Sequence, residues 1–270
     1  MISAALRGFV LAIAGSAVAA CSSAPEPEYV EQPVYELYNE AMDQLISGDV
    51  FVAARKFDEV ERQHPYSVWA IKGKLMSAFS YYSGSRYDEA ILAAQRFVEL
   101  HPGNRDISYA YYLIAMSYYE QITDVGRDQE ITRLALASLE EVTRRFPASE
   151  YARDAGLKID LTRDHLAGKE MSVGRYYLKR GQYVAAINRF RTVIESYQTT
   201  THVPEALHRL TETYLALGVE NEAQTAAAVL GHNFPRSDWY LDSYGLLRGR
   251  NLEPSEDERS WISRVWGTVF

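Results

Sequence analysis

The feature that most constrains the fold of this chain is a repeat built from small residues and helix stops. Four prolines, Pro65, Pro102, Pro147 and Pro235, recur at one position of the repeat, and Gln198 occupies that position in the fourth unit. An alanine precedes each of them by twelve residues, at Ala53, Ala90, Ala135, Ala186 and Ala223. In four units another small residue lies twelve positions earlier, at Ala41, Ala78, Gly174 and Thr211. In the third unit it is Ala115, twenty before Ala135, so that unit carries an eight-residue insertion. Five units in one frame indicate an internal repeat.

Each unit has the parts of two antiparallel helices joined by a tight turn. Small residues at fixed places let two helix backbones approach closely, and glycine at the turn supplies the left-handed conformation that ends a helix. Apolar residues recur seven positions after the second alanine, at Val60, Phe97, Val142, Val193 and Leu230. The pattern resembles the tetratricopeptide repeat, a helix-turn-helix unit of about 34 residues. The likeness is close in the stretch "YYSGSRYDEAILAAQRFVELHPGN".

We therefore predict an all-α fold: a right-handed superhelical solenoid of five tetratricopeptide-like helix pairs, about ten helices in all, with a concave surface. The helices of the second unit are expected near residues 66–83 and 86–100. The segment from Ser149 to Lys179 is either one long helix or two helices broken at Gly168.

The N-terminus has the organisation of a bacterial export signal. Residues 1–20 join a short polar start to an apolar run that is too short to span a bilayer, for which roughly 20 apolar residues are needed. The run ends at Cys21, the only cysteine, and "VAAC" resembles a lipobox, in which the cysteine becomes the lipidated first residue. Cys21 is the predicted lipidation site, and Ser22 beside it favours the outer membrane by the same resemblance. The other interpretation is an incidental cysteine in a soluble periplasmic protein.

Residues 21–33 are predicted to form a flexible, lipidated tether, because this segment is rich in proline and glutamate and poor in apolar residues. The whole chain has 36 acidic and 28 basic residues, a formal charge of −8. Proteins that bind nucleic acid usually show a concentrated basic face, so we expect no nucleic acid partner.

The sequence offers little catalytic chemistry. It contains no H-E-x-x-H, P-loop or G-x-S-x-G motif, and there is no second cysteine. Two of the six histidines, His64 and His101, directly precede repeat prolines, which favours a structural role for them. We therefore expect a protein that is not an enzyme, with no cofactor and no metal site.

Tyrosine is abundant, with 20 in the chain, and it often occurs in adjacent pairs. One member of each pair is expected to pack between helices, while the other points about 100° away and can face the concave groove. Tyrosine gives contact area with a polar tip, which suits peptide binding. Tyr82 and Tyr112, in the second and third units, are the predicted peptide-binding residues; ordinary packing between helices is the alternative.

Two segments do not follow the repeat. The insertion from Ile122 to Gln129 is either a loop whose Asp128 caps the next helix or a projecting loop that binds a partner. Residues 237–270 are expected to be a linker followed by an amphipathic tail. The apolar stripe of this tail comprises Trp261, Ile262, Val265, Trp266, Val269 and Phe270. The stripe caps the open end of the solenoid, docks onto a partner protein or lies in the membrane interface.

The lipobox, the tether and the five units together resemble the tetratricopeptide-repeat lipoproteins that assemble β-barrels in the outer membrane. The resemblance covers residues 21 to about 235 and is most specific in "RDQEITRLALASLEEVTRRFPASEYARDA" and "LTRDHLAGKEMSVGRYYLKRGQYVAAINRF". It implies a lipoprotein anchored on the periplasmic face of the cell outer membrane. The partners that it implies are the periplasmic domain of the barrel insertase BamA, other assembly lipoproteins and unfolded outer-membrane protein substrates.

The same resemblance suggests a division of labour along the chain. Residues 34–147, the first three repeats, would receive substrate, and residues 148–236, the last two repeats, would hold the scaffold contacts. Arg189 matches a family arginine that contacts the insertase; the alternative is an ordinary exposed helix arginine.

Two other functions use similar parts: a periplasmic tetratricopeptide scaffold that coordinates cell-wall synthesis, and a subunit of a lipoprotein-anchored enzyme. Co-purification from solubilised outer membranes separates barrel assembly from the scaffold function, because a barrel insertase accompanies one and cell-wall synthases accompany the other.

Overall fold

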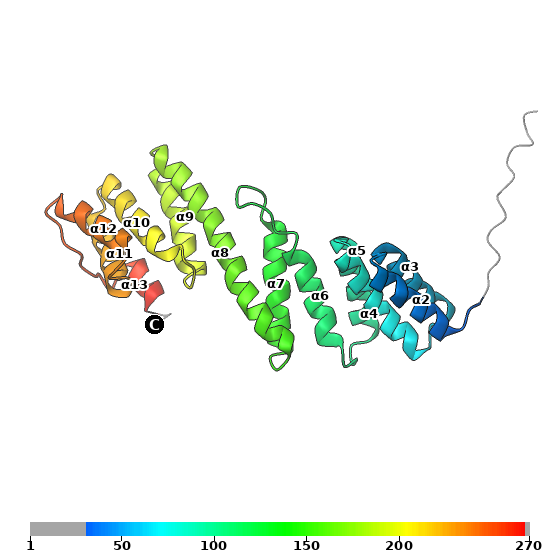
Figure 1. Ribbon diagram of the computed structural model, residues 1–270. Coiled ribbons are helices and arrows are strands. Elements are labelled where there is room, and N and C mark those ends of the chain that lie inside the picture. The colour runs from blue at the N-terminus through cyan, green and yellow to red at the C-terminus, as the bar shows by residue number, and fades with distance from the viewer. Residues whose placement is uncertain (1–30, 268–270) are drawn as a thin grey trace, which may run out of the picture.

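The computed structural model describes residues 31–267, and all regular structure in that range is helical (Figure 1). The predicted signal peptide, Cys21 and most of the tether lie outside the described residues. The helices follow one another in chain order along one elongated array (Figure 1). The prediction of an all-α, tetratricopeptide-like solenoid is therefore confirmed.

Five helix pairs make up the repeat region. The first helices of the pairs are α2 (Val34–Ser47), α4 (Val68–Ser83), α6 (Ile107–Tyr119), α8 (Glu150–Lys179) and α10 (Val203–Leu217). The second helices are α3 (Val50–Gln63), α5 (Tyr87–Leu100), α7 (Glu130–Arg145), α9 (Tyr183–Ser196) and α11 (Glu220–Asn233). Helices α3, α5, α7 and α9 each pack between their own partner and the first helix of the next pair, and α2, α4, α6 and α8 also contact one another in that order. The second pair lies within two residues of its expected bounds.

The small residues that reveal the repeat lie where paired helices cross. Nine of them are 0% exposed: Ala41, Ala53, Ala78, Ala90, Ala115, Ala135, Ala186, Thr211 and Ala223. The tenth is Gly174, on α8, which is also buried. A Cβ built on Gly174 would lie 2.4 Å from Cε1 of Phe190 on α9, so the two helices cross at a distance that this glycine permits.

The second recurring position explains how each second helix ends. Val60 and its four counterparts are at most 1% exposed, and the carbonyl of each accepts the N–H of the residue before the helix stop. Those donors are His64, His101, Phe146, Tyr197 and Phe234, each of which is the C-cap of its helix. In two units this C-cap is a histidine, His64 or His101, and in the other three it is an aromatic residue, so the backbone contact does not require histidine.

The first helix of the fourth pair is exceptional in length. Residues Glu150–Lys179 form the single 30-residue helix α8, which continues through Gly168 without a break. This settles the choice between one helix and two, and it accounts for the long spacing between Pro147 and Gln198. The insertion from Ile122 to Gln129 forms a loop between α6 and α7.

The region after residue 236 departs from the expected linker and tail. Residues Asp238–Arg248 form α12, which packs on α10 and α11 and covers the end of the last pair. The sequence pattern missed α12 because this helix has no following partner and hence no second alanine and no closing stop. The apolar stripe forms α13 (Trp261–Trp266), which folds back onto α11 and α9 rather than over that end. Two members of the stripe, Val269 and Phe270, lie outside the described residues.

Candidate partner-binding surfaces

Four tyrosines from three successive first helices meet on one surface, which we call the tyrosine cluster: Tyr82 on α4, Tyr109 and Tyr112 on α6, and Tyr151 on α8. The rings of Tyr112 and Tyr151 stack with their centroids 5.1 Å apart, and the centroids of Tyr109 and Tyr151 are 5.4 Å apart. Burial raises the pKa of both Tyr109 and Tyr112, and Tyr82 lies close enough to add to both shifts. All four side chains are partly exposed. The fold thus brings both predicted peptide-binding residues to one surface and adds two that sequence reasoning did not select.

Burial and neighbouring acids keep the hydroxyls of the cluster protonated. Burial, and next the carboxylate of Glu120, raises the pKa of Tyr82 to about 12. Burial also raises the pKa of Tyr109 to about 12, with Tyr151 as the next cause. The hydroxyl of Tyr82 points to Glu120 with an oxygen–oxygen distance of 3.5 Å. The cluster therefore presents neutral phenol rings at any physiological pH.

A carboxylate on α8 completes the cluster. Tyr112 donates a hydrogen bond to Asp154, and burial together with this bond raises the pKa of Tyr112. Asp154 also forms an ion pair with Lys158 at 2.9 Å, and this pair, followed by the Tyr112 bond, lowers the pKa of Asp154. Aromatic faces beside an ionised carboxylate suit a peptide that carries aromatic side chains and free backbone N–H groups.

Arg189, the predicted partner-binding residue, lies on α9 and reaches back to α8. Its guanidinium forms an ion pair with Glu170 at 3.1 Å, and the arginine side chain is 44% exposed. It lines a small cavity of about 230 Å³ together with Tyr177 and Asn188. Arg189 is therefore half-exposed and already paired within the chain, so any partner carboxylate would have to share it with Glu170 or displace Glu170.

The insertion packs onto the solenoid at several points. Lys169 on α8 donates hydrogen bonds to the backbone carbonyls of Gly126 and Arg127. Gln129, 4% exposed, donates to backbone carbonyls of the same loop. The Asp128 carboxylate accepts the N–H of Glu130, the first residue of α7, but the N-cap of α7 is Gln129, whose side chain makes no capping hydrogen bond. The segment is a loop, as one interpretation expected, but Asp128 is not the N-cap of α7. Partner binding by this loop stays a prediction.

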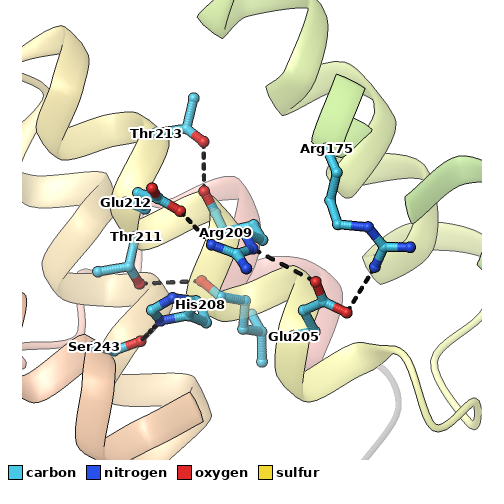
Figure 2. Close-up of polar contacts among 9 residues, drawn as sticks. Arg175, Glu205, His208, Arg209, Thr211, Glu212, Thr213 and Ser243 are labelled. Atoms are coloured by element: carbon cyan, nitrogen blue, oxygen red, sulfur yellow. Dashed lines mark hydrogen bonds and ion pairs between the residues drawn. The ribbon is translucent and has the colours of Figure 1, made fainter. Parts of the chain in front are cut away.

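A polar network that sequence reasoning missed joins α8 and α10 (Figure 2). Glu205, 15% exposed, accepts from Arg175 of α8 at 2.8 Å and from Arg209 at 3.5 Å. Arg209 donates also to Glu212 at 2.8 Å. The spacing of Glu205 and Arg209 is visible in the sequence as neighbours on one helix face. The partnership with Arg175, thirty residues earlier, depends on how α8 and α10 lie together.

A buried histidine beside this network joins α10 to α12. His208, 5% exposed, has Nδ1 2.9 Å from the hydroxyl oxygen of Ser243 on α12 (Figure 2). Its ring lies 5.1 Å from that of Trp239. Burial, and next the Arg209 guanidinium, lowers the pKa of His208. The neutral imidazole therefore helps to hold α12 on α10.

Residues 31–267 lack two other kinds of site. No group of three or more His, Cys, Asp or Glu side chains in that range is placed to hold a metal ion. Within the same range, no helix combines the length and the apolar character that crossing a bilayer requires.

Comparison with known proteins gives one consistent result. A family model described as "Outer membrane lipoprotein" (YfiO) matches residues 30–230. A protein of Caulobacter vibrioides named "Outer membrane protein assembly factor BamD" is 51% identical, over 90% of this chain and 80% of its own length. Proteins of the same name from Rickettsia prowazekii and Neisseria meningitidis are 44% and 36% identical, over 88% and 78% of this chain and 95% and 83% of theirs.

Proposed function

The chain belongs to the BamD family of outer membrane protein assembly factors, and we propose that it works there as a non-catalytic lipoprotein that binds the barrel insertase BamA and receives unfolded outer-membrane protein substrates. The proposal has three parts: a lipid anchor, a substrate surface and an insertase contact. Each depends on different residues, so each has its own test.

The anchor is Cys21, acylated after removal of residues 1–20, which holds the repeats on the periplasmic face of the outer membrane. Support comes from the lone cysteine after a short apolar run and from the lipoprotein family that matches the chain. Several acyl chains make such an anchor effectively permanent, because each buried CH₂ contributes about 0.8 kcal/mol. Replacing Cys21 with alanine and fractionating cells tests it: the anchor is refuted if the variant stays in the outer membrane without a partner to retain it.

The observation that carries the substrate role is the tyrosine cluster. Unfolded barrel strands alternate apolar and polar residues and carry aromatic girdles near the strand ends. The cluster offers stacked rings for those aromatics, and Asp154 and Glu120 offer carboxylates for backbone N–H groups. It spans α4, α6 and α8, so a segment lying across it contacts three helix pairs.

Site-specific photocrosslinking tests the substrate role. A crosslinking amino acid at Tyr82 or Tyr112 captures a nascent outer-membrane protein, and one at Leu92, a 66% exposed side chain on a second helix, serves as the control. The substrate role predicts capture at the two tyrosines and little at Leu92. Capture at Leu92 alone contradicts it.

The insertase contact is assigned to the last two repeats, with Arg189 as its charged residue. Support comes from the match of Arg189 to the family motif and from its half-exposed position on α9. An arginine shared between Glu170 and a partner carboxylate is worth several kcal/mol if the pair is desolvated and little if it stays exposed. The other function considered, a scaffold for cell-wall synthesis, has no support from the relatives, all three of which carry the assembly-factor name.

A further inference from the structure

The chain packs its helix α13 into the groove between two neighbouring second helices. Helix α13 lies between α9 and α11. Trp261 donates its indole N–H to the hydroxyl of Tyr214 at 2.9 Å, and the Arg191 guanidinium lies 4.7 Å from the centre of the same indole. The Ser260 hydroxyl donates to Glu222 at 2.6 Å. The α9/α11 groove therefore binds a short amphipathic helix of the same chain, with a tryptophan as the anchoring residue.

The repeat frame identifies an equivalent groove between α5 and α7. Two residues correspond when they have the same offset from the small residue of their unit. With the α9/α11 residue given first and its α5/α7 counterpart second, the pairs are Arg191 and Gln95, Ile194 and Val98, Tyr214 and Tyr118, Glu222 and Leu134, Thr225 and Ala137, and Ala226 and Ser138. The tyrosine that receives the tryptophan N–H is thus present in both grooves.

The exposure of these residues differs between the two grooves. Ile194, Thr225 and Ala226 are each 0% exposed in the groove that α13 fills. Their counterparts Val98 and Ser138 are partly exposed, and Ala137 is exposed. The α5/α7 groove is instead a cavity of about 490 Å³.

The lining of this cavity indicates what it binds. Its floor is apolar, with Val98 on α5, Ile114 on α6 and Leu134 on α7, and Leu134 is 40% exposed. The hydroxyl of Tyr118 and the exposed carboxylate of Glu99 also line it, and within residues 31–267 neither forms a hydrogen bond or an ion pair. A phenol oxygen accepts a hydrogen bond and a carboxylate attracts a cation.

We propose that the α5/α7 groove is a docking site for a short amphipathic helix of a partner protein, anchored by an aromatic N–H on Tyr118 and a basic residue on Glu99. This goes beyond substrate receipt and insertase binding, because it involves neither the tyrosine cluster nor Arg189. The occupant differs from α13 in one respect: Leu134 stands where Glu222 accepts the Ser260 hydroxyl, so the occupant carries an apolar residue there.

A peptide titration with the full mature chain, tail in place, tests the proposal. The probe is the labelled peptide RLWISRVWGTVF, which is residues 259–270 with Ser260→Leu and carries two arginines. Saturable binding to the parent protein is expected. Ala137→Arg, which fills the groove from an exposed position, should lower the affinity at least tenfold. Tyr118→Phe and Glu99→Gln should each lower it several-fold. Tyr214→Phe, the matched change in the groove that α13 fills, leaves the affinity within twofold.

Three outcomes overturn the proposal. The first is no binding by the parent protein. The second is binding that responds to Tyr214→Phe and not to Ala137→Arg, which places the peptide in the α9/α11 groove. The third is concentration-dependent self-association of the parent protein that Ala137→Arg abolishes, which makes the tail of a second copy the occupant. Photocrosslinking at Tyr82 and Tyr112 is independent of all three, so failure here is distinguishable from failure of the substrate role.

Discussion

Phe190 lies directly against the backbone of Gly174, where a Cβ would come within 2.4 Å of its ring. The phenylalanine is 0% exposed and belongs to the core shared by α8, α9 and α10, so its ring has little room to move. The repeat has a small residue at this position in every unit. At Gly174 the two helices lie so close that even a methyl side chain would clash with Phe190.

Gly174→Ala is expected to lower the free energy of unfolding. Overpacking a core costs about 1–3 kcal/mol, and the fully buried ring favours the upper part of that range. This outweighs the roughly 1 kcal/mol that alanine gains over glycine inside a helix. Gly156→Ala is the control on the same helix: nothing lies within 4 Å of its Cβ, so it should raise stability. Urea unfolding of both variants measures the difference, and equal effects would contradict the close packing.

Removal of residues 251–270 is expected to lower the melting temperature of the isolated protein. The deletion uncovers the α9/α11 groove and removes Ile262 and Trp266, which are 0% and 6% exposed. In a domain of this size about 1 kcal/mol shifts Tm by roughly 2–4 °C, and Ile262→Ala in the full chain should give a smaller shift in the same direction. An unchanged Tm in both variants would show that the contacts of α13 add nothing to stability.

Arg189→Glu is expected to weaken binding to the insertase while leaving helicity unchanged. Its effect on stability should be small, because an exposed ion pair contributes about 0–1 kcal/mol. The double variant with Glu170→Arg restores an ion pair inside the chain with the charges exchanged. If Arg189 contacts the partner, the double variant recovers stability but not binding, as measured by calorimetric titration with the periplasmic domain of BamA. Full recovery of affinity would show that the pair acts only within the chain.

Stability is expected to fall as the pH drops below about 6.5, in part because of His208. The pKa of this histidine is lowered in the folded protein, so the unfolded chain takes up a proton first as the pH drops below about 6.5. The loss grows as the pH falls towards the folded pKa and does not grow further below it. Besides Arg209, the charged groups that influence it are Glu212, Asp242 and Glu205.

His208→Asn should flatten this pH dependence, because asparagine keeps a polar contact for Ser243 and does not titrate. A residual slope is expected from His101, whose pKa is also lowered, by burial and next by Lys74. Chemical unfolding at pH 7.5, 6.5 and 5.5 checks the effect. The same slope in the parent and the variant would show that His208 does not titrate with folding.

The helix pairs could be predicted because the close approach of two helix backbones requires small residues, and these recur at a fixed spacing in the sequence. Ala53 and Ala90 mark it in neighbouring units, and both are 0% exposed. Helix α12 carries no such mark, because nothing follows it as a partner helix. The stripe of α13 revealed its apolar face but not the groove that receives it, since the contact between Trp261 and Tyr214 joins positions 47 residues apart.

The candidate surfaces were only partly predictable for a similar reason. Tyr112 stood out as one of a pair, and Tyr109, three residues earlier, shares its helix face. Tyr151 begins a later helix, and only the packing of α6 on α8 brings it to the cluster. The ion pair of Arg189 with Glu170 was hidden in the same way, because it depends on how α8 and α9 cross.

Helix α8 is unbroken over 30 residues, so its length also determines how the two halves of the molecule are rotated relative to each other. At about 1.5 Å and 100° per residue, the helix is roughly 45 Å long, and each residue added to or removed from its middle turns everything beyond it by about 100°. Seven added residues would come within about 20° of the original orientation but move the last two repeats by about 10 Å. The length of this helix therefore determines the rotation of the second half of the solenoid relative to the tyrosine cluster. Short insertions or deletions there should be selected against even where every contact around them survives.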